Sequence, residues 1–477
     1  MKVDGMRVSK YIVTMIGALM LSCSNFTDIE PTHSLTPNNA FKTMDDLELH
    51  LNGIYSGFQS TGYFALAYGT LPDIMSDNLA ENVESLGSYR SLSDWLYVSN
   101  DGSISGIWAT PYNMLNDCNI LLNNVDNFKE TNAGQRNRLK GQALAIRAIT
   151  HFDLLRYFGQ SYDRNSTALG VPVKTVSNLD KPKRNTVKEV YDQIYADLNQ
   201  AKTLLSGSLD HSVNTSTDRS RLDAIGTAAV FARVAYYAKD YPTASSNASS
   251  VISGGFGLAN RTDFPTIWSA DAITNEVIWY IKFFPGDGYA AGDVYFAVNN
   301  RVSYNPSQSL LSIYDVINDI RYSSYFSSST ANRPGQLIVS KYLGPTNDGL
   351  VNWKAFRVGE MYLILAESKA RTNQEPSAMA DLNTLRGTRI LGYVNQNLTG
   401  AALLTAISVE RRKELFLEGH RWFDLRMNGQ GITRGGDCKA PATNCSLPFN
   451  NFRFIWPIPQ DEMKANPNIA TQQNDGY

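Results

Sequence analysis

The sequence is poor in the residues that most often build reactive or metal-binding centres. Its 477 residues include only four cysteines and five histidines. The histidines form no HExxH pattern and accompany no cysteine cluster with zinc-ligand spacing. A phosphate-binding loop, a G-x-S-x-G elbow and an EF-hand-like acidic run are also missing. We therefore expect no metal and no cofactor, with structural calcium not indicated, and we favour a protein that is not an enzyme.

Neither basic nor acidic residues are in clear excess. The 43 basic residues nearly balance the 45 acidic ones, which leaves a formal net charge of −2. Proteins that bind nucleic acid usually carry a basic patch that neutralises phosphates. Nucleic acid is therefore not an expected partner.

Long apolar runs are scarce, and the first one stands at the N-terminus. Residues 11–21 form an apolar run of about eleven residues behind Lys2, Arg7 and Lys10, too short for the roughly 20 residues of a membrane-spanning helix. This pattern is typical of a secretory signal peptide. The best later run, residues 224–238, is interrupted by Arg233, so no second spanning segment is expected.

The apolar run ends at Ser22-Cys23, which resembles a lipoprotein box. We predict a lipoprotein signal peptide over residues 1–22, with Cys23 acylated as the mature N-terminus. Several acyl chains on one residue anchor a protein stably. Residues 23–37 would form the anchor and tether, and residues 38–477 the exported body.

Three cysteines remain after Cys23. Cys438 and Cys445 lie in a short polar loop, and an oxidising compartment would allow them to pair. The sequence leaves open whether they pair or stay reduced. Cys118 falls within a helical pattern and is expected to be a buried small apolar residue.

Hydrophobic periodicity predicts a mainly α fold, in which long helices alternate with loop-rich insertions carrying short strands. Thr186 and Glu189 stand at capping-box spacing, and Pro242 stands in the first turn of its helix. The expected helices cover residues 44–58, 107–125, 133–158, 186–205, 221–239, 242–252, 353–371, 377–386 and 401–418.

The segment FARVAYYAKDYPTASSNASSVI, residues 231–252, places small and aromatic residues as a tetratricopeptide repeat does. A looser version recurs at residues 360–386, and a third pairing is expected between residues 143–158 and the helix that follows Thr186. Long segments intervene. We therefore predict a tetratricopeptide-like helical scaffold with insertions rather than a regular solenoid.

The insertions, about residues 71–106 and 254–306, are rich in Gly, Ser, Asn and aromatic residues. Strand-like alternation appears at residues 276–284. Binding sites often lie on long loops that a rigid scaffold carries, so we expect the ligand site there.

Two features contain residue types that catalytic sites use, but the sequence around each is more typical of a structural role. His151 stands among Phe152, Leu154 and Leu155, as a packed helix residue would. The charged segment 410–426 contains Glu410 with Lys413 and Arg411 with Glu414 at helical pairing distance, which favours a partly buried ion-pair network. Paired carboxylates for glycoside hydrolysis remain open, because their separation depends on the tertiary structure.

The charged segment, ERRKELFLEGHRWFDLR, resembles a hallmark of the SusD/RagB family of Bacteroidota outer-membrane lipoproteins. In order along the chain, GQALAIRAITHFDLLRYFG, TVKEVYDQIYADLNQA, ARVAYYAKDYPTA, FRVGEMYLILAESKAR with ADLNTLR, and the terminal FIWPIPQDEMKANPNIATQQNDGY also resemble that family. The resemblance extends from the residues after Cys23 to the C-terminus.

This resemblance implies about four tetratricopeptide-like units on the outer leaflet of the outer membrane, facing the cell exterior. It implies that the protein captures glycans, as most members of the family do, or peptides, as some members do. It also implies that the protein acts as a lid on a SusC-like TonB-dependent transporter. A peptide-binding protein with the same transporter partner is the alternative, and a glycoside hydrolase is the least favoured.

Glycan capture needs flat apolar faces with amide, carboxylate or guanidinium groups beside them. The first insertion offers Asp77, Asn78, Tyr89, Arg90, Trp95 and Tyr97 as candidate ligand-binding residues. The second insertion offers Tyr289, Tyr295, Asn299, Asn300, Arg301 and Tyr304. Trp108, Trp422 and Trp456 are expected to pack within the scaffold instead.

Overall fold

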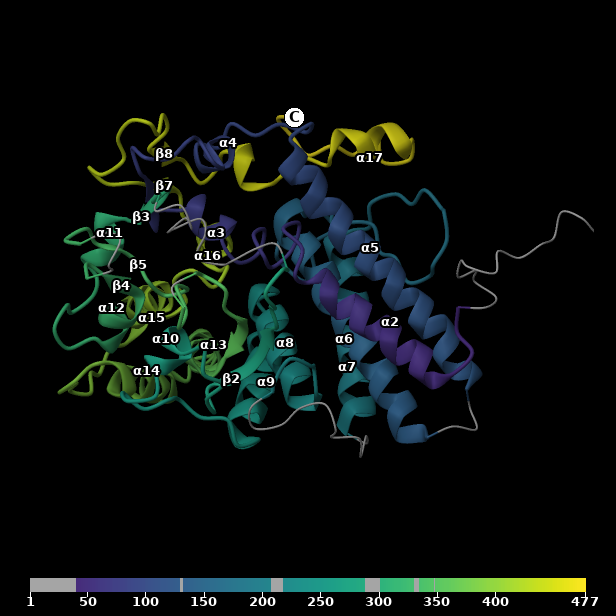
Figure 1. Cartoon of the computed structure of the whole chain (residues 1–477), viewed down its shortest axis with the longest axis horizontal. Helices are drawn as coiled ribbons and strands as arrows, with labels where there is room; N and C mark the ends of the chain where they lie inside the picture. The colour runs from purple at the N-terminus through teal and green to yellow at the C-terminus, as the bar shows by residue number, and fades with distance from the viewer. Residues whose placement is uncertain (1–39, 129–131, 207–217, 288–300, 330–333, 347) are drawn as a thin grey trace, which may run out of the picture.

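The computed structural model describes residues 40–128, 132–206, 218–287, 301–329, 334–346 and 348–477 (Figure 1). The predicted signal peptide, Cys23 and the tether lie outside these residues. Within them, no helix is both long enough and apolar enough to cross a membrane.

Helices dominate, and six of the nine longer ones begin with a side-chain cap that satisfies free backbone amides. Thr43 and Asp46 form a capping box at the first of them, and Thr186 and Glu189 form the predicted one, with hydrogen bonds of 2.8 and 3.2 Å. The longer helices are α2 (Met44–Gly57), α5 (Gly102–Asn124), α6 (Ala133–Phe158), α7 (Val187–Ser206), α8 (Ala224–Tyr237), α9 (Tyr241–Ser253), α13 (Val358–Arg371), α14 (Glu375–Arg389) and α15 (Gly400–Glu414).

Short helices and turns connect the scaffold and fill its loops. They are α3 (Leu71–Ile74), α4 (Arg90–Ser93), α10 (Thr266–Ser269), α11 (Gln308–Leu311), α12 (Ile320–Tyr325), α16 (Arg421–Met427), α17 (Gln460–Ala465) and the 3₁₀ turns Val125–Asn127 and Phe452–Phe454. The expected mainly α class is confirmed.

The helices pack as the predicted pairs, α6 with α7, α8 with α9, and α13 with α14. Figure 1 shows α2, α5, α6 and α7 on one side, α8 and α9 in the middle, and α13 to α15 on the other side. At the α8–α9 crossing Ala232, Ala235, Ala244 and Ala248 are fully buried. Such small side chains allow the two backbones to approach closely, as the sequence pattern predicted.

Four antiparallel two-stranded sheets complete the described fold. They pair β1 (Leu79–Glu81) with β3 (Tyr304–Pro306), β2 (Val277–Ile281) with β6 (Trp353–Arg357), β4 (Phe326–Ser327) with β5 (Ile338–Val339), and β7 (Ile432–Thr433) with β8 (Ser446–Leu447). Strand β2 lies within the segment where alternation indicated a strand.

The sequence prediction of helix over residues 353–371 was wrong for its first five residues. Trp353–Arg357 form strand β6 because they pair with β2, and all five are buried. The predicted helix over 401–418 also ends early, at Glu414. Beyond it Gly419 has φ +81°, and a Cβ there would lie 1.7 Å from the carbonyl oxygen of Tyr68. The chain therefore turns tightly against the segment just before the first insertion.

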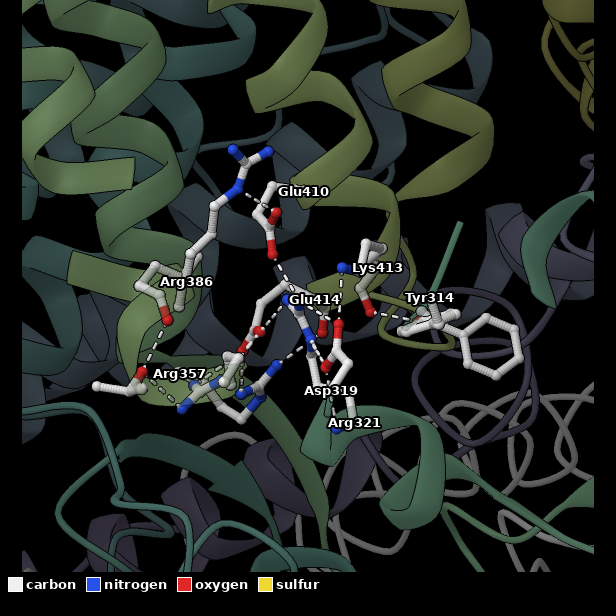
Figure 2. A network of polar contacts seen from close by, with 12 residues as sticks. Tyr314, Asp319, Arg321, Arg357, Arg386, Glu410, Lys413 and Glu414 are labelled. Carbon is white, nitrogen blue, oxygen red and sulfur yellow. Dashed lines mark hydrogen bonds and ion pairs between the residues drawn. The ribbon is translucent and has the colours of Figure 1, made fainter. Parts of the chain in front are cut away.

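A buried ion-pair network joins the charged segment to the rest of the scaffold (Figure 2). Oε1 of Glu414 lies 3.0 Å from both Arg357 and Arg389, and its Oε2 lies 3.0 Å from Arg321. Glu410 contacts Arg321 at 2.6 Å. These five side chains are at most 1% exposed. The predicted network therefore exists, and it is buried more completely than expected.

The partners in that network differ from the helical pairs that the sequence suggested. Lys413 contacts Asp319 at 2.7 Å, and Arg411 contacts Asp424 at 2.8 Å. Their partners belong to α16 and to the turn before α12, which approach α15 only in the folded chain. Burial strengthens such cross-element pairs, whereas solvent weakens pairs along an exposed helix.

His151 is a structural residue, as its sequence context indicated. Its Nδ1 donates to the carbonyl oxygen of Arg147 at 3.0 Å, and its Nε2 accepts from the amide of Lys174 at 3.1 Å. Burial, with the charge of Arg147, lowers the pKa of His151 to about 3. Cys118 is a buried free cysteine, and Cys438 and Cys445 form a disulfide.

Candidate ligand-binding surface

The two insertions meet through the β1–β3 pair. Glu81 pairs with Tyr304, and Leu79 pairs with Pro306. Beyond the pair, the amide of Asn82 donates to the carbonyl oxygen of Ser303 at 2.9 Å. Segments separated by the whole α5–α9 scaffold thus share one surface, near α3 and α4 in Figure 1. We call this surface, formed by residues 81–98 and 301–305, the insertion surface.

Asp77 and Asn78, two of the predicted ligand residues, fasten the first insertion to the charged segment. The Asp77 carboxylate accepts two hydrogen bonds from Arg421, at 2.7 and 2.8 Å. Nε of Arg412 donates to the side-chain oxygen of Asn78 at 2.8 Å. Burial opposes ionisation of Asp77, but the hydrogen bonds and charge of Arg421 lower its pKa overall. Both residues are committed to protein contacts.

A small cavity of about 220 Å³ lies beside these contacts. Arg412 and Arg421 line it together with Thr405, Ser408 and Val409 of α15, and with Ile313 and Gln430. Burial lowers the pKa of Arg412 to about 10. The cavity therefore offers guanidinium and hydroxyl groups next to Asp77 and Asn78, at the start of the first insertion.

Trp95 is not the exposed platform that the sequence predicted. Its ring is 3% exposed, and its indole N–H donates to the carbonyl oxygen of Met75 at 2.9 Å. The guanidinium of Arg434 stands 4.4 Å from the ring centroid. Because Arg434 also donates to the carbonyl oxygens of Ile74 and Ser93, the ring is held in the core.

Tyr97 and Tyr304 are likewise core residues, which corrects their assignment as sugar platforms. Tyr97 is 1% exposed, its hydroxyl donates to the carbonyl oxygen of Arg453, and its ring packs against Trp456. Tyr304 is fully buried and donates to the carbonyl oxygen of Ser88 at 2.7 Å. Trp456 is also fully buried, as the scaffold interpretation expected.

Tyr89, Arg90 and Arg301 remain half-exposed on the insertion surface. Tyr89 has φ +59° and stands at the N-cap of α4. Arg90 forms an ion pair with Glu81 at 2.9 Å while 35% of its side chain stays exposed. The remaining predicted residues, Tyr289, Tyr295, Asn299 and Asn300, lie outside the described residues.

Aliphatic side chains, rather than aromatic rings, are the most exposed apolar groups of the first insertion. Val83 is 81% exposed, Leu86 76%, Leu96 54% and Val98 48%. The sequence interpretation passed over them because it searched for aromatic platforms. It also missed Arg412, Arg421 and Arg434 as anchors, although their density in and after the charged segment was a visible signal.

No group of three or more His, Cys, Asp or Glu side chains in the described part of the chain could hold a metal ion. What the insertion surface presents is apolar area flanked by guanidinium groups and one half-exposed tyrosine. Such a surface is suited to noncovalent binding of a ligand with apolar faces and hydrogen-bonding groups.

Comparison with known proteins identifies two family matches. Residues 30–234 match a family described as starch-binding and associating with the outer membrane, and residues 321–477 match the SusD family. SusD-like protein P2 of Formosa agariphila is 25% identical, with 98% of this chain and all of that protein covered. SusD-like protein P38 of the same organism is 24% identical over all of both chains.

Solved structures show the same fold. A putative sugar binding protein from Bacteroides vulgatus is 27% identical, with a TM-score of 0.77 over 92% of this chain and 99% of that one. A SusD superfamily protein from the same species is 25% identical, with a TM-score of 0.79 over 92% and 100%. Helical pairs, insertions and both family matches agree, and the chain belongs to the SusD/RagB family.

Proposed function

We propose that this protein is a cell-surface lipoprotein that captures oligosaccharides at the insertion surface and delivers them to a SusC-like TonB-dependent transporter. In this proposal Cys23 carries the lipid, residues 23–37 tether the body, and residues 38–477 face the cell exterior. The protein binds its ligand and does not transform it. Membership of a family described as starch-binding and associating with the outer membrane supports the proposal.

The observation that carries the proposal is the β1–β3 pair, which joins both insertions in one surface. In this proposal the part of Tyr89 that is not packed against the core contacts the sugar ring, and Arg90 and Arg301 supply donors for its hydroxyl groups. All three are half-exposed. A sugar ring needs this combination of one flat apolar contact and several hydrogen-bond donors.

One observation favours peptide binding as a second candidate. The side chains most exposed in the first insertion are the aliphatic Val83 and Leu86, and the ring of Trp95 is buried. Aliphatic groups pack well against apolar peptide side chains, whereas sugars are usually held by aromatic faces. The insertion surface thus has features suited to either ligand.

Isothermal titration against a panel of plant, host and microbial polysaccharides, and separately against a peptide mixture, distinguishes the candidates. We expect heat with at least one glycan and a roughly fivefold weaker affinity in Tyr89→Ala, because stacking on an aromatic ring contributes about 1 kcal/mol. Tyr393→Ala, which removes a half-buried tyrosine from the α14–α15 connection, is the matched control.

Heat with peptides alone, abolished by Leu86→Asp, would replace the glycan assignment with the peptide one. Equal affinity in Tyr89→Ala and Tyr393→Ala would mean that the ligand binds elsewhere. Steady release of reducing sugar by the pure protein would contradict the proposal that it is not an enzyme.

A further inference from the structure

A cavity of about 800 Å³ is lined by no residue of either insertion. Its walls come from residues 160–163 after α6, Lys239 between α8 and α9, residues 426–429 at the end of α16, residues 449–452, and residues 474–475 near the C-terminus. We call it the C-terminal groove. Its volume falls in the range of about 300–1,000 Å³ that small-molecule sites occupy.

An exposed aromatic ring stands at this groove. Phe449 is 50% exposed, and among the described residues only Phe284 is another aromatic side chain of comparable exposure. Gly429, with φ +66°, lies beneath the tip of the ring, and a Cβ there would meet Cζ of Phe449 at 3.5 Å. The same Cβ would lie 3.6 and 3.8 Å from the two Cε atoms, so Gly429 covers one face of the ring near its tip. Half of the side chain stays exposed, which leaves area against which a ligand can pack.

Polar groups around the ring are mixed in kind and balanced in charge. Asn450 adds an exposed amide, and Asp163, Asp475 and Lys239 add exposed charged groups. With Arg426, two acidic and two basic side chains line the groove. A site for phosphate or a polyanion would carry a surplus of positive charge. A neutral ligand rich in hydroxyl groups suits this lining better.

Contacts within the protein hold the wall of the groove in place without a ligand. Arg426 donates to the carbonyl oxygen of Arg156 at 2.9 Å and stacks on Tyr162, with 4.4 Å to the ring centroid. The amide of Asn474 donates to the carbonyl oxygens of Phe158 and Trp456, at 2.9 and 2.7 Å. These contacts fix the wall before binding, which reduces the entropy cost of holding a ligand.

We propose that the C-terminal groove is a second carbohydrate site that binds a neutral oligosaccharide. One sugar ring stacks on Phe449, while Asn450 and Asp163 take part in hydrogen bonds with its hydroxyl groups. The assignment extends the proposed function to another part of the molecule. It depends on that function only in the choice of carbohydrate as the ligand.

Titration of the full-length protein with maltohexaose, cellohexaose, laminarihexaose, xylohexaose and mannohexaose tests the proposal. We expect two binding events with at least one of these sugars, and weak or no binding of trigalacturonic acid. Phe449→Ala and Asn450→Ala should each weaken one event roughly fivefold and leave the other unchanged. Phe284→Ala, which removes the similarly exposed ring elsewhere, should leave both unchanged.

The variants separate the two proposals. Loss of one event in Phe449→Ala and of the other in Tyr89→Ala supports both sites. A single event that responds only to Tyr89→Ala overturns the groove and leaves the insertion surface standing. A single event that responds only to Phe449→Ala supports the groove and overturns the insertion surface. Binding of none of the five neutral sugars overturns the groove, whatever the peptide titration shows.

Discussion

Glu414→Gln tests whether the buried network holds the fold together. The wild-type carboxylate accepts hydrogen bonds from Arg321, Arg357 and Arg389 over distances of 3.0 to 3.1 Å, two at each oxygen. Glutamine would replace one carboxylate oxygen with an NH₂ group, whose N–H donors would face the N–H donors of the guanidinium groups. The substitution would also remove one of the negative charges that balance the three buried arginines. Breaking a buried ion pair costs about 3–5 kcal/mol.

The expected fall in melting temperature follows from that cost. An entropy of unfolding of about 2.1 cal/mol/K per residue, over roughly 440 folded residues, gives about 1 °C for each kcal/mol. Glu414→Gln should therefore melt about 3–5 °C below wild type at pH 7. Differential scanning calorimetry measures this directly.

Asp192→Asn on α7 is the matched control, because it makes the same chemical change in an exposed pair. Asp192 is 44% exposed and lies 2.5 Å from Lys188 and 3.1 Å from Arg164. Each such pair contributes only about 0.2–1 kcal/mol, so the melting temperature of Asp192→Asn should shift by about 2 °C or less. If the melting temperature of Glu414→Gln fell no further than that of Asp192→Asn, the buried network would not be the source of stability in this region.

The pH dependence gives an independent check on the same carboxylate. Burial alone would raise the pKa of Glu414, but the charges of Arg389, Arg357 and Arg321 lower it well below its ordinary value. A carboxyl with a depressed folded pKa stabilises the protein above its unfolded pKa of about 4.3, and this stabilisation is lost as the pH falls. The difference between wild type and Glu414→Gln should therefore shrink below about pH 4.

Three further predictions follow from the structure. Trp95→Ala should destabilise the protein by about 3–5 kcal/mol in urea unfolding, since the ring is buried; unchanged stability would contradict that placement. His151 should stay neutral down to about pH 4 in ¹⁵N-histidine NMR, because burial lowers its pKa to about 3; titration near pH 6.5 would contradict it. Cys23→Ala should yield a folded, ligand-competent protein lost from the membrane fraction, and retention there would refute the lipid anchor.

Local sequence patterns were sufficient for most of the scaffold. The expected helix over residues 133–158 coincides with α6, and the alanine-rich pattern near Tyr241 correctly predicted a close helix pair. Helical periodicity and capping depend on residues within a turn or two of one another, so they can be recognised before the chain folds. The prediction failed at Trp353–Arg357, where pairing with a distant strand decided the structure.

The sequence by itself determined the mainly α scaffold, the family and the dense charged segment, because each depends on residues that are neighbours in the chain. Only the tertiary structure decided which aromatic rings reach solvent. Trp95 is buried because Arg434 covers its ring, whereas Phe449 is exposed beside Gly429. Exposure of a loop side chain depends on the distant segments that pack over it, and no local pattern records them.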